Sequence, residues 1–415
     1  MIINKFGGVS IKDTASVQRM AKICSNYILN GVIVVSAMGK MTNMLESLAQ
    51  AYFAKKETKN IYNQFVEFHT IIIKQLFQDE NHEVFKNVDV FFKALKDKLS
   101  QAPELNYDFE YDQIVPFGEL LATTIVSQYL NLMGQKVIWR DIRKSLKTDH
   151  TYRDAKVDWK LSEGLTKTNF NDLENTIYLT QGYIGSDSNN MSTSLGREGS
   201  DYTAAILANI LNAEKVVVWK DVLGVMCADP QWIPNAPIIP KLSYLDAIEL
   251  AFFGAKVIHP KTIKPLQNKN IPLQVRSFIS TDDEGTIINK FENFDIPPVY
   301  IKKEKQVLIS IKPFDFSFIV EENLSHIFGI LAAHQIKVNL MQNSAISFSI
   351  VVDNELGRVD KVIKELKKFY NVKYNELLEL ITIRHNKPGA EYLVLNGRKI
   401  LVEQKSRMVA RFVVQ

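Results

Sequence analysis

A short stretch near the middle of the chain places charged residues of both signs at the expected start of a helix. It reads "GREGSD" over residues 196–201, and the helix-forming run "YTAAILA" follows it directly. The positive end of a helix dipole favours anions, so Ser200 or Asp201 could be simple N-terminal caps. A cap does not explain Arg197, because the dipole disfavours a cation at this end unless an anion lies between them. The stretch therefore indicates an anion site at Arg197.

A second candidate site follows the first apolar run of the chain. Residues 2–6 contain Lys5, and Gly7 and Gly8 come directly after them. Backbone amides of such a turn can converge with the lysine ammonium on a phosphate group, and an ordinary tight turn is the alternative. The later pair Gly39-Lys40 is not a P-loop, because Val and Met occupy positions 34 and 41, where that motif requires Gly and Ser or Thr.

Other polar residues stand at ends of apolar runs or in expected first turns. Ser36 and Thr42 follow the run at 31–35, where helix capping is the simpler interpretation. Glu119 begins an otherwise apolar helix, where it either complements the dipole or binds a substrate ammonium. Asp221 directly follows the run 215–220 and is a candidate nucleotide contact, and Lys256 has the charge for a phosphate.

Strands alternate with helices over the first two thirds of the chain. Residues 2–6 and 31–38 are predicted strands around a helix at 10–29, which is a βαβ unit. Helical spacing continues over 46–112, and further apolar runs occur at 136–141, 176–185 and 215–221. This order predicts a mostly parallel sheet covered by helices on both faces. Ligands bind at the carboxyl ends of such strands, which is where the polar residues lie.

The pattern changes near residues 282–301, where a Pro-Pro pair marks a boundary. Residues 306–374 then predict strand, helix, strand, strand, helix, strand, the order of a ferredoxin-like unit. Three further strands fit a second, abbreviated copy. The expected domains are therefore 1–290, 300–376 and 377–415.

Composition excludes several classes of protein. A net charge of +4 from 50 basic and 46 acidic residues, without a basic stripe, argues against nucleic acid as a partner. Cys24 and Cys227 are too far apart in sequence to suggest a zinc or disulfide framework. The first residues do not resemble a signal peptide, and no run is long enough to span a membrane. A cytoplasmic protein without a membrane partner is expected.

Seven stretches, in this order along the chain, resemble the aspartokinases of the amino-acid kinase family: "KFGGVS", "VVSAMGKMTN", "FGELLA", "QGYIGS", "SLGREGSDYTAA", "WKDVLGVMCADP" and "YLDAIELAFFGAKVIHP". The resemblance implies an amino-acid kinase-like α/β sheet sandwiched by helices, followed by ferredoxin-like (α+β) ACT regulatory units. It implies transfer of the γ-phosphoryl group of Mg²⁺-ATP to the side-chain carboxylate of L-aspartate. The product, 4-phospho-L-aspartate, leads to lysine, threonine and methionine.

The resemblance also implies roles for individual residues. Lys5 would neutralise charge on the transferred phosphoryl group, and Asp201 would orient Lys5 or the metal ion, which needs no direct protein ligand. Arg197 would bind a carboxylate of aspartate and Glu119 its ammonium. The other positions matching substrate-binding residues are Thr42, Tyr183, Glu198, Gly199 and Ser200. The positions matching ATP-binding residues are Lys5, Gly7, Gly8, Ser36, Lys220, Asp221, Met226, Gln231, Lys256 and Val257.

The chain departs from the family pattern at several of these positions. Lys220, Met226 and Gln231 stand where Thr, Tyr and Arg are common, which bears on nucleotide affinity. Glu198 replaces a glycine, and Lys40 replaces another glycine. As neighbours in one site, Glu198 and Lys40 are expected to form a compensating ion pair.

ACT units of this family bind amino acids across a dimer interface, so a homodimer and feedback by lysine or threonine are expected. Glu322 replaces a frequent glycine and Asn339 a frequent aspartate. The candidate effector residues are Ser317, Val320, Glu322, Leu324, Asn339 and Ser344.

Two alternatives remain open at this level. One is a kinase for glutamate, acetylglutamate or carbamate, which the ACT-like tail disfavours. The other is a catalytically silent amino-acid sensor, although a sensor would not need Lys5, Glu119, Arg197 and Asp201 together.

Overall fold

The computed structural model describes residues 1–415 except 175, 256–257, 293–294, 316 and 356. The chain forms two compact units. Unit 1 comprises Met1–Val225, Ile238–Ile248 and Lys256–Phe294, and unit 2 comprises Met226–Pro237, Glu249–Ala255 and Asp295–Gln415. Within the described ranges, no helix combines the length and apolar character needed to cross a membrane.

Unit 1 is built around an eight-stranded sheet. Its strands are parallel apart from the antiparallel pair of β9 and β10. In spatial order they are β3 (Val137–Arg140), β4 (Ile177–Gln181), β2 (Gly31–Val35), β1 (Ile2–Phe6), β7 (Lys215–Lys220), β9 (Leu273–Ser277), β10 (Thr286–Asn289) and β8 (Lys241–Ser243). A short hairpin of β5 (Ile184–Ser186) and β6 (Ser192–Ser194) lies outside this sheet.

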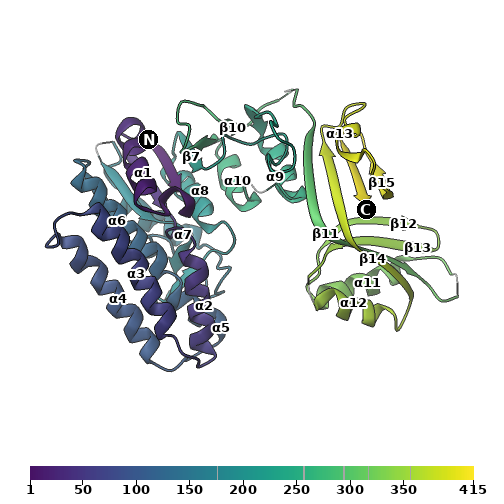
Figure 1. Ribbon diagram of the computed structural model, residues 1–415, viewed down its shortest axis with the longest axis horizontal. Coiled ribbons are helices and arrows are strands. Elements are labelled where there is room, and N and C mark those ends of the chain that lie inside the picture. The colour runs from purple at the N-terminus through teal and green to yellow at the C-terminus, as the bar shows by residue number, and fades with distance from the viewer. Residues whose placement is uncertain (175, 256–257, 293–294, 316, 356) are drawn as a thin grey trace. The chain divides into compact units, whose positions relative to one another are not determined.

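Helices cover both faces of this sheet (Figure 1). One large apolar core joins the sheet to α1 (Thr14–Tyr27), α2 (Met41–Phe53), α3 (Lys59–Leu76), α4 (Glu83–Ser100), α5 (Tyr107–Ile114) and α6 (Phe117–Leu132). Elsewhere α8 (Gly199–Leu211) packs beside α7 (Trp159–Asn169) and α10 (Pro260–Gln267). Two 3₁₀ turns are η1 (Gly8–Ile11) and η2 (Ile142–Lys144), and α9 (Tyr244–Phe253) begins in unit 1.

The central strands follow directly from their sequence. β2 consists of glycine, valine and isoleucine, and all five residues are buried, as expected for a parallel strand covered on both faces. The helix after β1 begins where the carboxylate of Asp13 accepts a hydrogen bond from the Ser16 amide at 2.8 Å. The predicted α/β fold class is confirmed for this part of the chain.

Unit 2 contains a six-stranded antiparallel sheet. In spatial order its strands are β12 (Val338–Ser344), β13 (Ser347–Asp353), β11 (Val299–Lys312), β14 (Asn371–Arg384), β16 (Val409–Val414) and β15 (Ile400–Lys405). Helices α11 (Glu321–Ala333) and α12 (Arg358–Leu366) pack on one face of β11, β12 and β13, and α13 (Tyr392–Leu395) packs near β14 and β16. This is the ferredoxin-like arrangement expected from the sequence.

The division into units differs from the expected domain boundaries in two respects. β14 is one 14-residue strand that runs through the expected boundary at 376/377. It pairs with β11 on both sides of that boundary, with register shifts between Lys303 and Leu308, and its second half also pairs with β16. Segments 226–237 and 249–255 belong to unit 2, where Trp232 and Ile233 pack against the apolar side chains of β14 and β16. The periodicity of a sequence shows that a segment has an apolar face, but it does not show which of two cores buries that face.

Candidate active site

Lys5 lies in the middle of the sheet of unit 1. It pairs in register with Val34 of β2 and Val218 of β7, and its side chain is 10% exposed. Its Nζ lies 2.6 Å from Oδ1 of Asp201, which stands in the first turn of α8. The two predicted catalytic residues, almost two hundred positions apart in sequence, therefore form a buried ion pair.

Lys220 brings a second ammonium to the same carboxylate. It ends β7, and its Nζ lies 3.4 Å from Oδ2 of Asp201 and 3.8 Å from Oε2 of Glu198. Burial alone would raise the pKa of Asp201, but Lys5 and Lys220 outweigh it and hold that pKa below its usual range. Burial and the nearby Asp201 raise the pKa of Glu198, although Lys220 opposes this shift.

The expected ion pair between Glu198 and Lys40 is wrong. Glu198 pairs with Lys220 instead, and Lys40 has no ion-pair partner among the described residues. The reason is geometric: β7 runs beside β1, so its terminal lysine arrives next to the start of α8.

The start of α8 leaves Arg197 available to a ligand. Arg197 is exposed, and nothing in the described part of the chain forms an ion pair or hydrogen bond with its guanidinium. The flanking glycines shape this turn: a Cβ on Gly196 would lie 2.7 Å from Oδ1 of Asp154, and one on Gly199 would lie 2.7 Å from the Tyr183 ring. Ser200 is buried in the first turn, next to Gly199.

Glu119 is a buried carboxylate in the first turn of α6. It is 2% exposed, and its Oε1 accepts a hydrogen bond of 3.3 Å from the amide of Ala37, just after β2. Its Oε2 is buried and has no hydrogen-bond partner within the described residues. Burial raises the pKa of Glu119 to about 8. A cation that reached Oε2 would satisfy both the unused acceptor and the charge.

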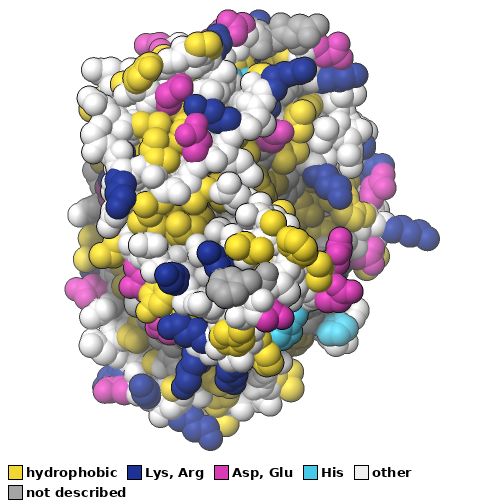
Figure 2. Space-filling model, turned by 90° about the vertical axis from the view of Figure 1, so that its right-hand side faces the viewer, with side chains coloured by type: hydrophobic (Ala, Val, Ile, Leu, Met, Phe, Trp, Pro, Cys, Tyr) yellow, Lys and Arg dark blue, Asp and Glu magenta, His cyan; other side chains and the backbone are white. Residues whose placement is uncertain are grey.

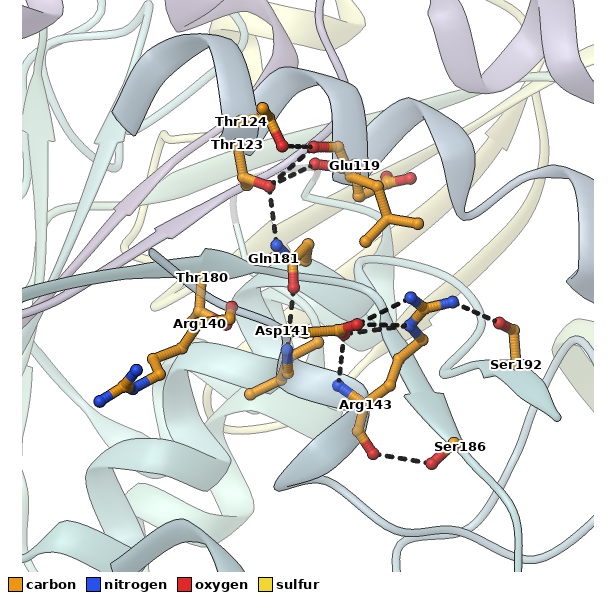
Figure 3. A network of polar contacts seen from close by, with 12 residues as sticks. Glu119, Thr123, Thr124, Arg140, Asp141, Arg143, Thr180, Gln181, Ser186 and Ser192 are labelled. Carbon is orange, nitrogen blue, oxygen red and sulfur yellow. Dashed lines mark hydrogen bonds and ion pairs between the residues drawn. The ribbon is translucent and has the colours of Figure 1, made fainter. Parts of the chain in front are cut away.

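A polar network holds the backbone of Glu119 in place (Figure 3). The Thr123 hydroxyl donates to the carbonyl of Glu119 at 2.8 Å and accepts from Nε2 of Gln181 at 2.7 Å. Trp139 donates its indole N–H to the same hydroxyl at 3.0 Å, and Gln181 Oε1 accepts from the amide of Ile142 at 2.9 Å. The first turns of α6 are thus tied to β3, β4 and η2.

Tyr183 stands at a positive φ of 74°, two residues after the end of β4. Its amide donates to the hydroxyl of Thr203 in α8 at 3.0 Å, and its own hydroxyl lies 3.2 Å from that of Tyr111. The ring packs against Gly199, where a side chain would not fit. Tyr183 therefore forms an aromatic wall against the start of α8.

Sequence reasoning missed the support for this wall. Asp112 accepts the amides of Arg153 and Ser194 at 2.9 and 2.8 Å and the Ser194 hydroxyl at 2.6 Å, while burial raises its pKa to about 6. The Arg153 guanidinium lies 4.6 Å from the centre of the Tyr111 ring. The only signal in the sequence is an acidic residue amid aromatics at 107–112.

The glycine turn after β1 packs tightly. A Cβ on Gly8 would lie 2.7 Å from the carbonyl oxygen of Ala37, and one on Gly7 would lie 3.3 Å from Nζ of Lys5. Ser36 donates its amide to the carbonyl of Phe6 at 3.2 Å, and Thr42 stands in the first turn of α2. The turn therefore brings backbone close to the ammonium of Lys5.

The remaining nucleotide positions are only partly placed. Asp221 is exposed directly after β7. Met226 and Gln231 belong to unit 2. Lys256 and Val257 lie outside the described residues.

The candidate effector residues lie around the start of α11 and along β12. Val320 precedes α11 and donates its amide to Asn323 at 3.1 Å, Ser317 lies in the segment before it, and Glu322 and Leu324 are in α11. Asn339 and Ser344 are in β12. The Asn339 amide group contacts side chains on β11 and β13: Lys303 at 2.9 Å, Gln306 at 2.8 Å and Asp353 at 2.9 Å.

Comparison with known proteins agrees with this geometry. The family model described as "Amino acid kinase family" matches residues 1–277, and the chain belongs to that family. Within it, lysine-sensitive aspartokinase 3 of Escherichia coli is 30% identical over 93% of this chain and 87% of its own length. Aspartokinase 2, chloroplastic, of Arabidopsis thaliana is 28% identical over 92% of this chain and 74% of its own. The chain is thus a member of the aspartokinases.

Solved structures agree as well. E. coli aspartokinase III in complex with lysine and aspartate superposes with a TM-score of 0.84 at 27% identity, covering 100% of this chain and 96% of that one. The same enzyme in complex with aspartate and ADP gives a TM-score of 0.81 with the same coverage. The predicted kinase fold followed by ACT-like regulatory structure is confirmed.

Proposed function

We propose that this site transfers the γ-phosphoryl group of ATP to the side-chain carboxylate of L-aspartate. The observation that carries the proposal is a pair of groups, Glu119 and Arg197, whose side chains keep binding capacity that the described residues leave unused. Glu119 offers a buried carboxylate oxygen without a partner, and Arg197 offers an exposed guanidinium. An amino acid with a second carboxylate matches both groups and still presents a nucleophile.

The chemistry needs little from the protein beyond position and charge. An oxygen of the ionised carboxylate attacks the γ-phosphorus, the bond to the bridging oxygen breaks, and ADP leaves with that electron pair. No proton has to be removed from the nucleophile, so no general base is required. Lys5 neutralises charge on the transferred group, and Asp201 holds the Lys5 ammonium in place.

The proposed substrate contacts follow from the same elements. Glu119 binds the ammonium of aspartate, and Arg197 binds one of its carboxylates. The amides and side chains that complete the pocket are those of Thr42, Tyr183, Glu198, Gly199 and Ser200.

The nucleotide is proposed to bind over the glycine turn with its magnesium ion. Asp201 and Glu198 both face lysines, and the described residues contain no cluster of three groups that could hold a metal ion. These residues fit Mg²⁺ carried by the phosphates of ATP, where the ion would neutralise phosphate charge. The proposed nucleotide contacts are Lys5, Gly7, Gly8, Ser36, Lys220, Asp221, Met226, Gln231, Lys256 and Val257.

Unit 2 is proposed to bind a regulatory amino acid, lysine or threonine, and to pair with a second copy of the chain. One support is the complex of the E. coli relative with lysine. Another is the edge strand β12, where Met341 is 54% exposed, with Phe318 before α11 at 69%. Figure 2 shows groups of hydrophobic side chains at the surface of the molecule.

A substrate panel tests the proposal. ADP release is measured with Mg²⁺-ATP and, in separate assays, L-aspartate, L-glutamate, N-acetylglutamate and carbamate, and hydroxylamine traps any acyl phosphate formed. We expect turnover and a hydroxamate product with aspartate. Turnover with another acceptor instead of aspartate would show that the chain is a different kinase of the amino-acid kinase family. Amino-acid binding without ADP release would indicate a sensor.

A further inference from the structure

Arg153 has a backbone conformation that residues with a side chain rarely adopt. Its φ is 68°, in the left-handed region, and it lies in the segment between η2 and α7. A glycine would adopt this conformation without strain. Strain at a residue with a Cβ persists where its surroundings determine the conformation. The contacts of Arg153 are therefore the feature to explain.

The guanidinium of Arg153 contacts four side chains on two helices. It forms ion pairs with Glu46 of α2 at 3.4 Å and with Asp108 of α5 at 3.2 Å. It also lies 4.6 Å from the centre of the Tyr111 ring and 5.4 Å from that of Tyr107. Exposed ion pairs stabilise little, because water screens them. The Tyr111 ring is only 5% exposed, so it is the contact that links Arg153 to the interior.

The backbone of Arg153 contacts α5 at the residue next to this ring. Its amide donates to Oδ2 of Asp112 at 2.9 Å. The same carboxylate accepts the amide of Ser194 at 2.8 Å and its hydroxyl at 2.6 Å. A Cβ on Gly196 would lie 3.1 Å from the carbonyl oxygen of Arg153. The backbone at Arg153 therefore packs along the residues that lead to Arg197.

Tyr111 extends this contact to the proposed aspartate pocket. Its hydroxyl lies 3.2 Å from the hydroxyl of Tyr183, whose ring packs against Gly199 at the start of α8. Burial raises the pKa of the Tyr183 phenol, Tyr111 and Glu119 raise it further, and a hydrogen bond with the Ser194 side chain acts in the opposite direction. Both phenols stay protonated near pH 7, so the two hydroxyls share a hydrogen bond.

We infer that Arg153 is a positioning residue for the aspartate pocket, and that it acts through Tyr111 on the ring of Tyr183. The guanidinium fixes the Tyr111 ring, and the Tyr111 hydroxyl then fixes where the Tyr183 ring lies. Because that ring forms a wall of the pocket, its position sets the length of acceptor that fits. This inference rests on the proposed function, because it assumes that aspartate binds between Tyr183 and Arg197.

A double-mutant cycle tests the inference. Arg153→Gly removes the guanidinium and keeps the amide that donates to Asp112, Tyr111→Phe keeps the ring and removes the hydroxyl, and a third variant combines the two. Arg153→Lys keeps the charge without the planar group. Asp108→Asn is the matched control, because it breaks an ion pair of Arg153 and leaves the ring contact in place.

For each protein, kcat, the KM values for aspartate and Mg²⁺-ATP, kcat/KM for L-glutamate, the Kd for L-aspartate and the melting temperature are measured. The melting temperature shows that each variant is folded. The two KM values separate a change in the aspartate pocket from a general loss of structure, because a general loss would affect both substrates.

We expect Arg153→Gly to raise the KM and the Kd for aspartate by about 3- to 30-fold, the range for a partly desolvated contact between a cation and a ring. The KM for ATP should change by less than about 2-fold. The ratio of kcat/KM for glutamate to that for aspartate should rise about 3-fold or more, because a less constrained wall admits a longer acceptor.

The other variants should follow the same contact. Tyr111→Phe should show the same type of loss, and the double variant should be no worse than the weaker of the two single variants. Arg153→Lys should recover part of the loss, and Asp108→Asn should match the wild type.

Additive losses in the double variant would overturn the inference, as would equal losses for aspartate and ATP in Arg153→Gly. A loss in Asp108→Asn as large as in Arg153→Gly would overturn it too, because the ion pair would then carry the effect. A wild type that releases no ADP with any acceptor would refute the proposed function instead. The Kd for L-aspartate would then decide the inference: an unchanged value in Arg153→Gly, or no binding by the wild type, would contradict it.

Discussion

At the scale of single residues, the site depends on charges held away from water. Asp201 is satisfied by two lysines, whereas Glu119 is buried with one oxygen unused. A buried carboxyl without a cation is favoured in its neutral form, which is why the pKa of Glu119 rises to about 8. The unused oxygen of Glu119 can therefore bind a cation from a ligand.

This predicts that aspartate binding releases a proton near pH 7. Glu119 is protonated in the free protein, and the incoming ammonium lowers its pKa so that it ionises. Calorimetry in buffers of different ionisation enthalpy should detect about one proton released per aspartate at pH 7, and less at pH 9, above the free pKa. Glu119→Gln should abolish the release. Equal heats in all buffers with the wild type would contradict this role.

At the scale of elements, the sequence pattern put Lys5 and Lys220 near the carboxyl ends of predicted parallel strands, and the structure brings both to Asp201 in the first turn of α8. Parallel neighbours bring their carboxyl ends together, so the sequence order was enough. The pairing of Glu198 was not predictable, because it depends on a left-handed turn and on which strand lies beside β1. The role of Asp112 was equally hidden, since its partners lie 41 and 82 positions away.

Helix α3 carries a buried histidine whose titration should govern acid stability. His69 is fully buried, its ring meets those of Phe65, Phe68 and Phe92, and burial lowers its pKa to about 4. Between pH 6.5 and pH 4 the unfolded chain therefore binds a proton that the folded chain does not, and stability falls as pH falls.

In the wild type, His69 should lower the free energy of unfolding by about 3 kcal/mol between pH 7 and pH 4, and His69→Phe should abolish this part of the decrease. Urea denaturation at each pH measures the free energy of unfolding. The exposed His150, changed to Gln, is the control and should keep the wild-type slope. A His69→Phe protein with the wild-type pH dependence would show that His69 does not control it.

At the scale of the whole molecule, two segments within the kinase sequence belong to the regulatory unit. Arg384 of β14 forms an ion pair with Glu249 at 2.5 Å, and Arg411 lies 5.2 Å from the centre of the Phe253 ring. Segment 226–237 packs on the same unit and contains Met226 and Gln231, two of the proposed nucleotide positions. The domain boundaries predicted from sequence missed this, because only tertiary packing decides which core buries a segment.

Arg384→Leu should therefore loosen segment 249–255. Removing one partner of this largely buried pair should cost about 1 to 3 kcal/mol of local stability. Hydrogen exchange is expected to increase at 249–255 but not in β1 and β2. Lys387→Ala, which breaks an exposed pair with Asp295 in the same unit, is the control. Unchanged exchange at 249–255 would show that Arg384 does not hold the segment.

The anion site at the start of α8 is the most direct test of the account. Initial rates of ADP release are measured against aspartate and against ATP for wild type, Arg197→Ala and Arg19→Ala, an exposed arginine of α1. We predict that Arg197→Ala lowers kcat/KM for aspartate by about 10- to 100-fold while the KM for ATP changes less than about 3-fold, and that Arg19→Ala matches wild type. An Arg197→Ala enzyme with wild-type kinetics for aspartate would contradict the assignment of this helix start as the substrate site.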